Sequence, residues 1–350
     1  MVGAALVACG VDPSVDPAGP ADPVETLSAP GPYAVGYREE SVTWSDPLLD
    51  AGTRTLRLAV WFPTDAEAGP PVKYDGVFDA PGVLGGVDPA AGPHPLAVFS
   101  HGHQGFAESS GFLAVHLASH GWWVVSPDHT GNTTFDPPDR ETEIYWARPV
   151  DLSAVLDHAE QTLELDGTTV AIGHSFGGYT VHGLGGAASA IDALAPGCAD
   201  GSDGSEFCST MTDALADRFR AGFGDPRVAA VIAMAPGDYR LYGEGLAAID
   251  VPELLMTGGL DPGTDGDPIW AALDDPDDRR VTLPTAAHNT FTDFAAALDP
   301  DGAIDPDEGH RIIGAYALAF AEVHGRLDPF GAGILDGTDP VSDLAAITAH

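Results

Sequence analysis

The stretch from residue 168 to residue 184 carries a serine in a setting typical of a reactive nucleophile. Residues 173–177 read Gly-His-Ser-Phe-Gly; they follow the apolar run 168–172 and precede the helix-compatible residues 179–184. A strand that turns sharply into a helix lifts the serine hydroxyl out of the sheet, where it can attack a carbonyl carbon. A turn this tight leaves no space for side chains on its flanks, which explains both glycines. The pattern predicts that Ser175 is a nucleophile.

A nucleophilic serine needs a histidine that takes up its proton. His288 follows the expected strand 280–283, and on an open parallel sheet catalytic groups lie just beyond the carboxyl ends of strands. Between the expected elbow helix and the expected closing helix 309–325, it is the only histidine apart from His182, which lies inside the elbow helix. By elimination, we expect His288 to be the general base.

The acid that orients the histidine has two candidates. Asp261 comes a few residues after the expected strand 254–257, and Asp238 comes after the expected strand 228–234. Both positions are compatible with a carboxylate at the same edge of a parallel sheet. Loops of this chain are rich in aspartate, so position alone favours Asp261 only weakly, and Asp238 remains the alternative.

An acyl-transfer site also needs N–H donors for the negative charge that develops on the substrate oxygen. The loop 100–106, Ser-His-Gly-His-Gln-Gly-Phe, follows the expected strand 96–99, and its glycines let the backbone approach a substrate closely. We expect one donor to be the backbone N–H of His103, with that of Gln104 as the alternative. The other is the N–H of Phe176, at the N-terminus of the elbow helix.

Aromatic side chains flank these positions and are candidates for the lining of an apolar acyl pocket. They are Phe106, Trp146, Tyr179 and Phe291. Aromatic residues more often belong to the core of a protein, which is the alternative for each of them.

Two groups of residues could be drawn as metal sites, and in both a simpler interpretation is favoured. A catalytic metal would use His101, His103, Asp128 and His129. The Asp-His pair, however, lies a whole helix and strand beyond the His-x-His pair. A calcium loop would use Asp299, Asp301, Gly302, Ile304, Asp305 and Glu308. Its first ligand position would be Ala297, so a solvated acidic turn is favoured and we predict no metal site.

The surrounding pattern predicts the α/β fold class, with a mostly parallel sheet that carries helices on both faces. Residues 33–44 and 53–62 are expected to form an antiparallel strand pair at the start, and 69–95 a connection with little regular structure. From residue 95, short apolar strands alternate with helical patterns. Residues 185–227 interrupt this alternation as an excursion or partial lid, and the tail 328–350 is too weakly patterned for a role.

The charge of the chain limits its partners. It has 350 residues, of which 53 are acidic and 14 basic, for a formal net charge of -39. Such a surface repels nucleic acids and anionic membranes and disfavours polyanionic substrates. We therefore expect a neutral small-molecule or polymeric substrate, no nucleic acid partner, no transmembrane segment, and a monomer.

The three cysteines suggest an exported protein. Cys9 follows Leu-Val-Ala, which resembles a lipoprotein cleavage box, so residues 1–8 are interpreted as the remnant of a bacterial signal peptide and Cys9 as a lipidation site. Residues 9–32, rich in Pro, Gly and Asp, would be a flexible linker. Cys198 and Cys208 bracket a polar loop and are expected to form a disulfide in an exported protein.

Several further stretches carry a resemblance to a known family. They are 98–102 (Val-Phe-Ser-His-Gly), 117–121 (Leu-Ala-Ser-His-Gly), 128–132 (Asp-His-Thr-Gly-Asn), 148–151 (Arg-Pro-Val-Asp), 173–178 (Gly-His-Ser-Phe-Gly-Gly) and 288–291 (His-Asn-Thr-Phe). In this order they resemble the α/β-hydrolases of the platelet-activating-factor-acetylhydrolase-like, or predicted dienelactone hydrolase, group, which is related to cutinase-like polyester hydrolases. The resemblance extends over most of the expected domain 33–327.

The resemblance implies serine ester hydrolysis with a Ser-His-Asp triad and no metal or organic cofactor. The order Ser175, Asp261, His288 is that of the α/β-hydrolase triad. In the acetylhydrolase, the acid follows the strand after the elbow helix, where this chain has Ala235; the cutinase-like pattern has it one strand later, which favours Asp261. The alternatives are a cutinase- or polyester-hydrolase-like lipase and a catalytically inactive α/β-hydrolase that acts as a surface binding protein.

Overall fold

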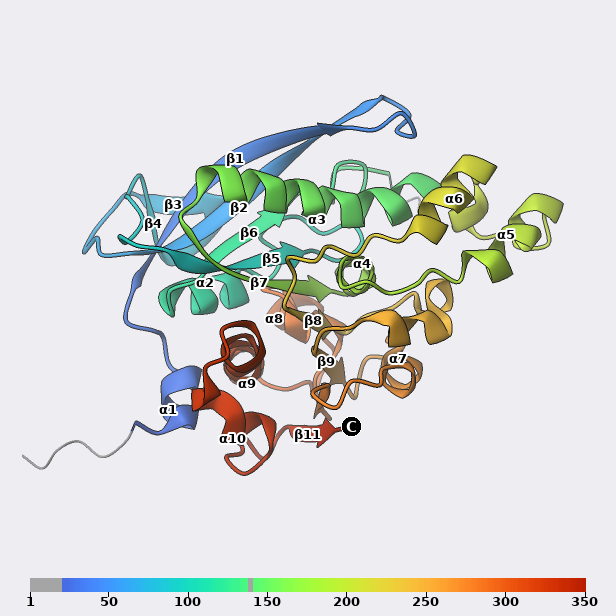
Figure 1. The fold of residues 1–350 in the computed structure, drawn as a ribbon. Coiled ribbons are helices and arrows are strands. Elements are labelled where there is room, and N and C mark those ends of the chain that lie inside the picture. The colour runs from blue at the N-terminus through green and yellow to red at the C-terminus, as the bar shows by residue number, and fades with distance from the viewer. Residues whose placement is uncertain (1–20, 138–140) are drawn as a thin grey trace, which may run out of the picture.

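The computed structural model describes residues 21–137 and 141–350, and within these residues the strands form one sheet (Figure 1). In chain order the strands are β1 (Ala34–Ser45), β2 (Thr53–Thr64), β3 (Pro71–Tyr74), β4 (Phe78–Gly85), β5 (His94–Ser100), β6 (Trp123–Pro127), β7 (Leu165–His174), β8 (Ala230–Met234), β9 (Glu253–Gly258), β10 (Arg279–Leu283) and β11 (Ala346–Ala349). Across the sheet they lie in the order β11-β10-β9-β8-β7-β5-β6-β2-β1-β4-β3.

The centre of the sheet is parallel and its start is antiparallel. Strands β6, β5, β7, β8, β9 and β10 pair in parallel from one neighbour to the next. The long strands β1 and β2 pair antiparallel along their whole length, and β2 joins the parallel part through β6. This arrangement confirms the expected α/β class with an N-terminal antiparallel strand pair.

Helices cover both faces of the sheet (Figure 1). They are α1 (Pro23–Ser28), α2 (Gly111–Ser119), α3 (Thr142–Thr162), α4 (Phe176–Leu184), α5 (Ile191–Asp200), α6 (Asp213–Ala221), α7 (Gly266–Ala272), α8 (Ala295–Leu298), α9 (Pro306–Phe320) and α10 (Ala332–Leu335). Short 3₁₀ helices are η1 (Glu206–Cys208), η2 (Tyr239–Leu241), η3 (Gly243–Ala248), η4 (His288–Phe291) and η6 (Pro329–Gly331), and η5 (Ala321–Gly325) is a π-helical segment that continues α9.

The alternation of side chains along β5 explains why both faces are covered. Ala97 and Phe99 pack in one core with α2 and α9, whereas Leu96 and Val98 pack in another with α3 and α4. Successive residues of a strand point to opposite faces, so a strand that is apolar throughout needs a layer on each side. The central strands are therefore covered on both faces, whereas alternate residues of β1 are exposed on one face.

Two segments differ from the expectation of little regular structure. Within the expected linker, residues 23–28 form α1, and the buried side chain of Leu27 packs in the core beside α9. His116 bonds the Leu27 carbonyl oxygen, and Arg311 donates to the Ser28 hydroxyl, which ties α1 to the domain. Residues 69–95 contain β3 and β4, which extend the sheet beyond β1. Residues 1–8 and Cys9, interpreted from the sequence as a signal-peptide remnant and a lipidation site, lie outside the described residues.

In the acidic stretch 299–308, which was considered as a calcium loop, two carboxylates instead accept hydrogen bonds from neighbouring segments of the chain. The Asp305 carboxylate accepts the N–H groups of Asp307 and Glu308 at the start of α9. The Asp299 carboxylate accepts the N–H of Asn289 and the hydroxyl of Thr290. Asp305 thus caps a helix start, as expected for an acidic residue there, whereas Asp299 holds the backbone next to His288.

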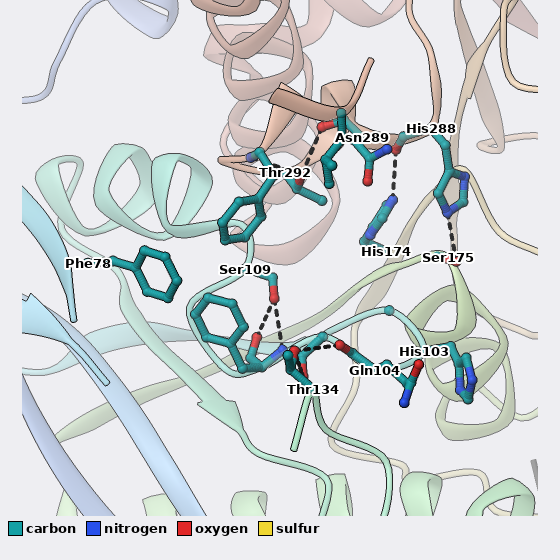
Figure 2. A pocket seen from close by; sticks show the side chains of 15 residues that line it. Phe78, His103, Gln104, Ser109, Thr134, His174, Ser175, His288, Asn289 and Thr292 are labelled. Carbon is teal, nitrogen blue, oxygen red and sulfur yellow. Dashed lines mark hydrogen bonds between the residues drawn. The ribbon is translucent and has the colours of Figure 1, made fainter. Parts of the chain in front are cut away.

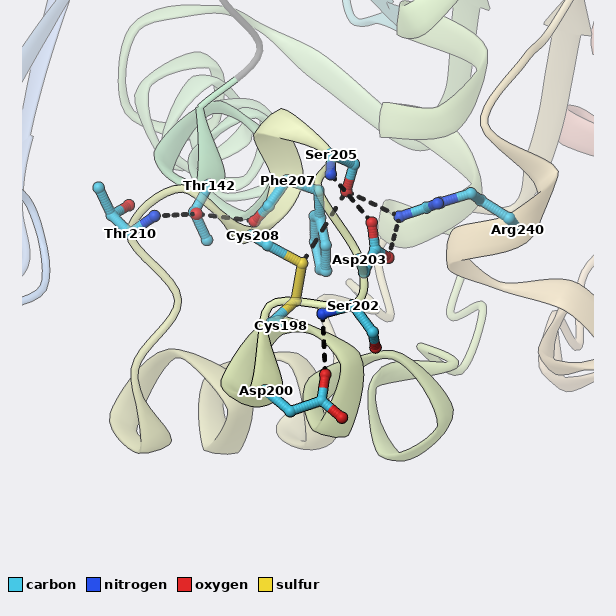
Figure 3. The surroundings of a disulfide bond; sticks show 10 residues. All are labelled: Thr142, Cys198, Asp200, Ser202, Asp203, Ser205, Phe207, Cys208, Thr210 and Arg240. Atoms are coloured by element: carbon cyan, nitrogen blue, oxygen red, sulfur yellow. Dashed lines mark hydrogen bonds and ion pairs between the residues drawn. A yellow bond between two sulfur atoms is a disulfide. The ribbon is translucent and has the colours of Figure 1, made fainter.

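The excursion 185–227 folds into α5, η1 and α6 and carries the expected disulfide, which joins Cys198 to Cys208 with Cα atoms 5.0 Å apart (Figure 3). Arg240 bonds the Asp203 carboxylate and the Ser205 hydroxyl between the two cysteines. The disulfide is typical of an exported protein. In the part of the chain that the structure describes, no helix has the length and apolar character of a membrane span.

A buried carboxyl group before β10 gives the fold a pH-dependent stability. Asp278 is 2% exposed and accepts the N–H groups of Glu253 and Asp275. Burial, together with the nearby Glu253 carboxylate, raises the pKa of Asp278 to about 7. Because the folded state holds this proton more tightly than the unfolded chain, the contribution to stability is complete below about pH 4 and is lost as the pH rises to about 7.

We therefore expect Asp278→Asn to change the pH dependence of the free energy of unfolding. Relative to the wild type, the variant should gain roughly 4 kcal/mol between pH 4 and pH 8, because asparagine has no proton to lose. Urea unfolding at several pH values measures this difference. Asparagine also loses one of the two accepted N–H bonds, but that cost is the same at every pH. A difference between the two proteins that stays constant with pH would contradict the prediction.

Candidate active site

The structure brings Ser175, His288 and Asp261 together in one chain of hydrogen bonds. The Ser175 Oγ lies 2.9 Å from the His288 Nε2, and the His288 Nδ1 lies 2.6 Å from the Asp261 Oδ2 (Figure 2 shows the serine and the histidine). The three residues follow the carboxyl ends of β7, β10 and β9, which are parallel strands of the same sheet. Residues that are far apart in the sequence meet because these strand ends share one edge.

The turn at Ser175 is strained in the way that the sequence pattern predicts. Ser175 has a φ of 55° and a ψ of -120°, between the end of β7 and the start of α4. A Cβ atom at Gly173 would overlap the Gly177 carbonyl group, and one at Gly177 would overlap the Ser100 carbonyl group. Both glycines are therefore required by the close approach of backbone. A non-glycine residue at positive φ costs energy and occurs mainly at functional sites.

The carboxylate that binds His288 belongs to Asp261, not to Asp238. The Asp261 side chain is 2% exposed and also accepts the N–H of Gly263. Burial raises the pKa of Asp261, but the hydrogen bond and the charge interaction with His288 outweigh it, so that the pKa lies below its usual value. Asp261 is therefore ionised at neutral pH. Asp238 lies on another loop, where it begins η2 in the left-handed conformation.

His174, for which no role was predicted from the sequence, bonds the backbone of His288. His174 is buried directly before Ser175, and burial, together with the nearby His288, lowers its pKa to about 3. The neutral ring donates its Nε2–H to the carbonyl oxygen of His288 at 3.0 Å. This bond fixes the backbone of the loop from which the His288 side chain extends. Its signal in the sequence is its position inside the elbow motif.

The candidate N–H donors lie beside Ser175. Phe176 is the first residue of α4, so its N–H is at the positive end of the helix dipole. His103 belongs to the loop after β5 and lines the same cavity as Ser175 (Figure 2). The Asn132 side chain donates to the His103 Nδ1 at 2.8 Å. Gln104 has a φ of 53°, a strained conformation that gives this loop a sharp turn.

The buried side chain of Arg148 binds the loop after β5, which carries His103. Arg148, on α3, is fully buried and donates to the Asn132 side chain, to the Ser100 hydroxyl and to the carbonyl oxygen of His101. Its guanidinium also lies over the Phe176 ring, 4.7 Å from the ring centroid. A planar guanidinium can serve acceptors in several directions at once. Arg148 thereby connects both candidate donor segments to the same helix.

The histidines considered as metal ligands belong to the same buried network. His129 bonds the Ser100 hydroxyl through Nε2 and the Asp151 carboxylate through Nδ1, and its backbone N–H donates to the His101 Nε2. Burial and the nearby Arg148 hold the pKa values of both rings well below the usual range. Asp151 in turn accepts from Arg54. Among residues 21–137 and 141–350, no three potential ligands gather as a metal site.

A cavity of about 370 Å³ opens beside Ser175, and the apolar side chains in its wall are those of Phe78, Phe106, Phe294 and Leu298. Of the predicted pocket residues, Phe106 lines it. Trp146, Tyr179 and Phe291 do not line it and are buried in the core, where Tyr179 stacks between Phe176 and Tyr242. The residues that the sequence analysis missed are Phe78, Phe294 and Leu298. No residue of the excursion 185–227 borders this cavity, so it does not act as its lid in this structure.

The strand order, the strained serine turn and the position of the three hydrogen-bonded residues are those of the α/β-hydrolase fold. Among solved structures, the chain is similar to a ferulic acid esterase from Streptomyces cinnamoneus, with a TM-score of 0.62 and 20% sequence identity over 93% of this chain and 98% of that one. No protein-family model matches the sequence, and no curated protein matches it. At this identity, the likeness establishes the fold.

Proposed function

We propose that the protein is a serine carboxylic-ester hydrolase that acts on neutral esters with short to medium acyl groups. The observation that carries the proposal is the hydrogen-bonded chain from Asp261 through His288 to Ser175, which opens into an apolar cavity. The similarity to a solved structure named as an esterase supports it. The net charge of -39 favours neutral substrates over anionic ones.

The mechanism follows from the roles of the three groups. The Ser175 Oγ attacks the ester carbonyl carbon while its proton passes to the His288 Nε2, 2.9 Å away. The ionised Asp261 stabilises the imidazolium that forms and fixes its orientation. His288 then gives the proton to the leaving alcohol, and the acyl group stays on Ser175. A water molecule, activated by His288, releases the acid.

The N–H groups of Phe176 and His103 are the proposed donors to the oxyanion. Both residues lie next to Ser175, and both are held by contacts with buried side chains rather than by solvent. Donors that are fixed before the reaction stabilise the transition state without reorganisation, and one such donor contributes about 3 kcal/mol. The loop's strained Gln104 remains the alternative to His103.

A second candidate function is polyester hydrolysis of the cutinase-like kind. It is favoured by the rim of the cavity, where Phe78 and Leu298 are 43% and 62% exposed and could contact a polymer surface. Export, which the disulfide supports, gives access to such a polymer. Anchoring through a lipid on Cys9 is proposed from the sequence motif alone, and we propose separately that the protein is a monomer.

Labelling with a fluorophosphonate tests whether the site is active. The folded protein should react at Ser175, and heat-denatured protein should not, because the reaction needs the activated hydroxyl. In parallel, hydrolysis of 4-nitrophenyl acetate, butyrate and octanoate should follow Michaelis–Menten kinetics. A folded protein that is neither labelled nor active would instead support the inactive binding protein.

The role of the buried Arg148 gives a further prediction. Arg148→Lys keeps the charge but cannot serve three acceptors in one plane, so the loop of His103 should shift. We expect kcat to fall about tenfold with KM nearly unchanged, because the donors act mainly in the transition state. Arg311→Lys, at an arginine that pairs with Glu308 away from the site, is the control. If Arg148→Lys had the same kcat and KM as the control Arg311→Lys, the proposed role of Arg148 in holding the loop of His103 would be contradicted.

A further inference from the structure

Three phenylalanine rings meet in the wall of the cavity that contains Ser175. Phe78 stacks on Phe106 with centroids 5.4 Å apart and planes 14° apart, and Phe294 meets both rings edge to face at 5.7 Å. They come from three separate segments: β4, the loop after β5, and the loop after η4. Figure 2 shows Phe78 at the end of the cavity remote from Ser175 and His288. We call these three residues the phenylalanine cluster.

Hydroxyl groups fix two members of the cluster in place. The Ser109 Oγ accepts the N–H of Phe106 at 2.9 Å and donates to its carbonyl oxygen at 2.7 Å. The Thr292 Oγ1 accepts the N–H of Phe294 at 3.2 Å. The two loops are joined to each other, because the N–H of Asp293 donates to the carbonyl oxygen of Ser109 at 2.9 Å. The aromatic wall is therefore built before any ligand arrives.

The exposure of the cluster indicates a ligand. Phe78 is 43% exposed although its ring stacks on Phe106, and Leu298 beside it is 62% exposed. Large apolar side chains at the mouth of a cavity expose apolar surface to water, which is unfavourable in free energy. A bound apolar group would cover this surface and remove the cost. Phe106 is itself buried, at 9% exposed, but a core role does not explain Phe78, whose exposed ring lines the cavity.

We propose that the phenylalanine cluster is a subsite for an aromatic ring of the ester, an assignment that rests on the proposed esterase function. Aromatic rings attract one another through stacked and edge-to-face contacts beyond the burial of area. Two stacked rings and a third ring set edge-on to them therefore favour a planar aromatic group over a saturated group of similar size. The cavity volume of about 370 Å³ is near the lower end of the range for small-molecule sites, which fits an ester with a single ring.

Matched pairs of esters test the subsite. Ethyl 3-phenylpropanoate and ethyl 3-cyclohexylpropanoate differ only in whether the six-membered ring of the acyl group is aromatic. We expect kcat/KM to be about fivefold or more higher for the phenyl ester. 2-Phenylethyl acetate and 2-cyclohexylethyl acetate carry the same comparison in the alcohol. The pair with the larger preference tells which part of the ester occupies the cluster, and equal rates within both pairs would overturn the proposal.

Variants connect the preference to the cluster. Phe78→Leu keeps an apolar side chain but removes one ring, and should lower the ratio of phenyl to cyclohexyl kcat/KM about threefold. Phe330→Leu is the matched control, because this phenylalanine is similarly exposed, at 37%, but lies outside the cavity. Its ratio should equal that of the wild type. A ratio that is unchanged in Phe78→Leu would exclude the cluster as the source of the preference.

Binding to an inactive variant separates this proposal from the esterase function. Ser175→Ala should bind the neutral amide 3-phenylpropanamide about fivefold more tightly than 3-cyclohexylpropanamide, as followed by NMR titration. If no ester is hydrolysed but this preference remains and falls in the double variant with Phe78→Leu, the subsite stands and the esterase function fails. If esters are hydrolysed but the amides bind equally and neither pair of esters shows a preference for the phenyl group, the subsite fails and the esterase function stands.

Discussion

Replacing Ser175 with alanine is expected to lower kcat for 4-nitrophenyl butyrate by about 10⁵-fold, to the rate left by binding and the oxyanion donors alone. Among the described hydroxyls that line the cavity, that of Ser175 bonds a histidine base, His288, at 2.9 Å, whereas those of Ser109, Thr134 and Thr292 donate to backbone carbonyl oxygens. Neither a neighbouring serine nor a directly activated water should replace it at a comparable rate.

The same substitution should leave the fold intact. Alanine accepts the strained backbone of position 175 about as well as serine does, and the side chain loses one hydrogen bond, to His288. The melting temperature should therefore change by about 2 °C or less. Ser342→Ala, at a serine that bonds Glu308 far from the cavity, controls for the loss of a hydroxyl. Substantial hydrolysis by pure Ser175→Ala would refute Ser175 as the nucleophile.

The sequence was sufficient to predict the serine, the histidine and the sheet because each has a short-range signal. The elbow needs two glycines within five residues, and the apolar strands alternate with helices at regular intervals. The fold inferred from these signals agrees with the structure, and His288 follows its strand as expected. Such local patterns survive in a single sequence because local geometry imposes them.

The walls of the cavity had no such signal. Phe78 lies in a Gly- and Pro-rich connection that becomes β4 by pairing with β3 at its start and with β1 at its end. Phe291 and Phe294 are three residues apart in one loop, yet the first is buried in the core and the second lines the cavity. Which of them faces inward depends on tertiary contacts of this segment: the Ser110 hydroxyl donates to the carbonyl oxygen of Phe291, and the N–H of Asp293 donates to the carbonyl oxygen of Ser109.

The N-terminal region is a second case in which the local sequence was an insufficient guide to the structure. Residues 21–32 have the composition of a linker, but Asp22 caps α1, and Leu27 enters a groove formed by distant helices. Composition predicts how a segment behaves in isolation. Here the helix is stabilised by the burial of Leu27 against α9, which the composition of the segment does not reveal. Similarly, β11 forms at the edge of the sheet by pairing with β10, from a tail without a strand pattern.

Exchanging Asp261 for asparagine should lower kcat about 10⁴-fold with little change in KM. Asparagine fits the same space, but its amide donates where the carboxylate accepts, which favours the imidazole tautomer whose proton lies on Nε2. That tautomer cannot take the proton of Ser175, and the stabilisation of the imidazolium is lost as well. Steady-state kinetics with a short acyl ester measure the effect, and intact folding is checked by circular dichroism.

Asp238→Asn is the matched control, because it makes the same chemical change at the carboxylate that the sequence left as the alternative acid. Asp238 lies on the loop after β8, one strand away from Asp261, and the bond to the His288 Nδ1 is made by Asp261. We expect kcat for Asp238→Asn to stay within about threefold of the wild type. If Asp238→Asn lost more activity than Asp261→Asn, the loop after β8 would supply the acid during turnover, as in the acetylhydrolase-like pattern. The hydrogen bond between Asp261 and His288 would then not be the one that acts in catalysis.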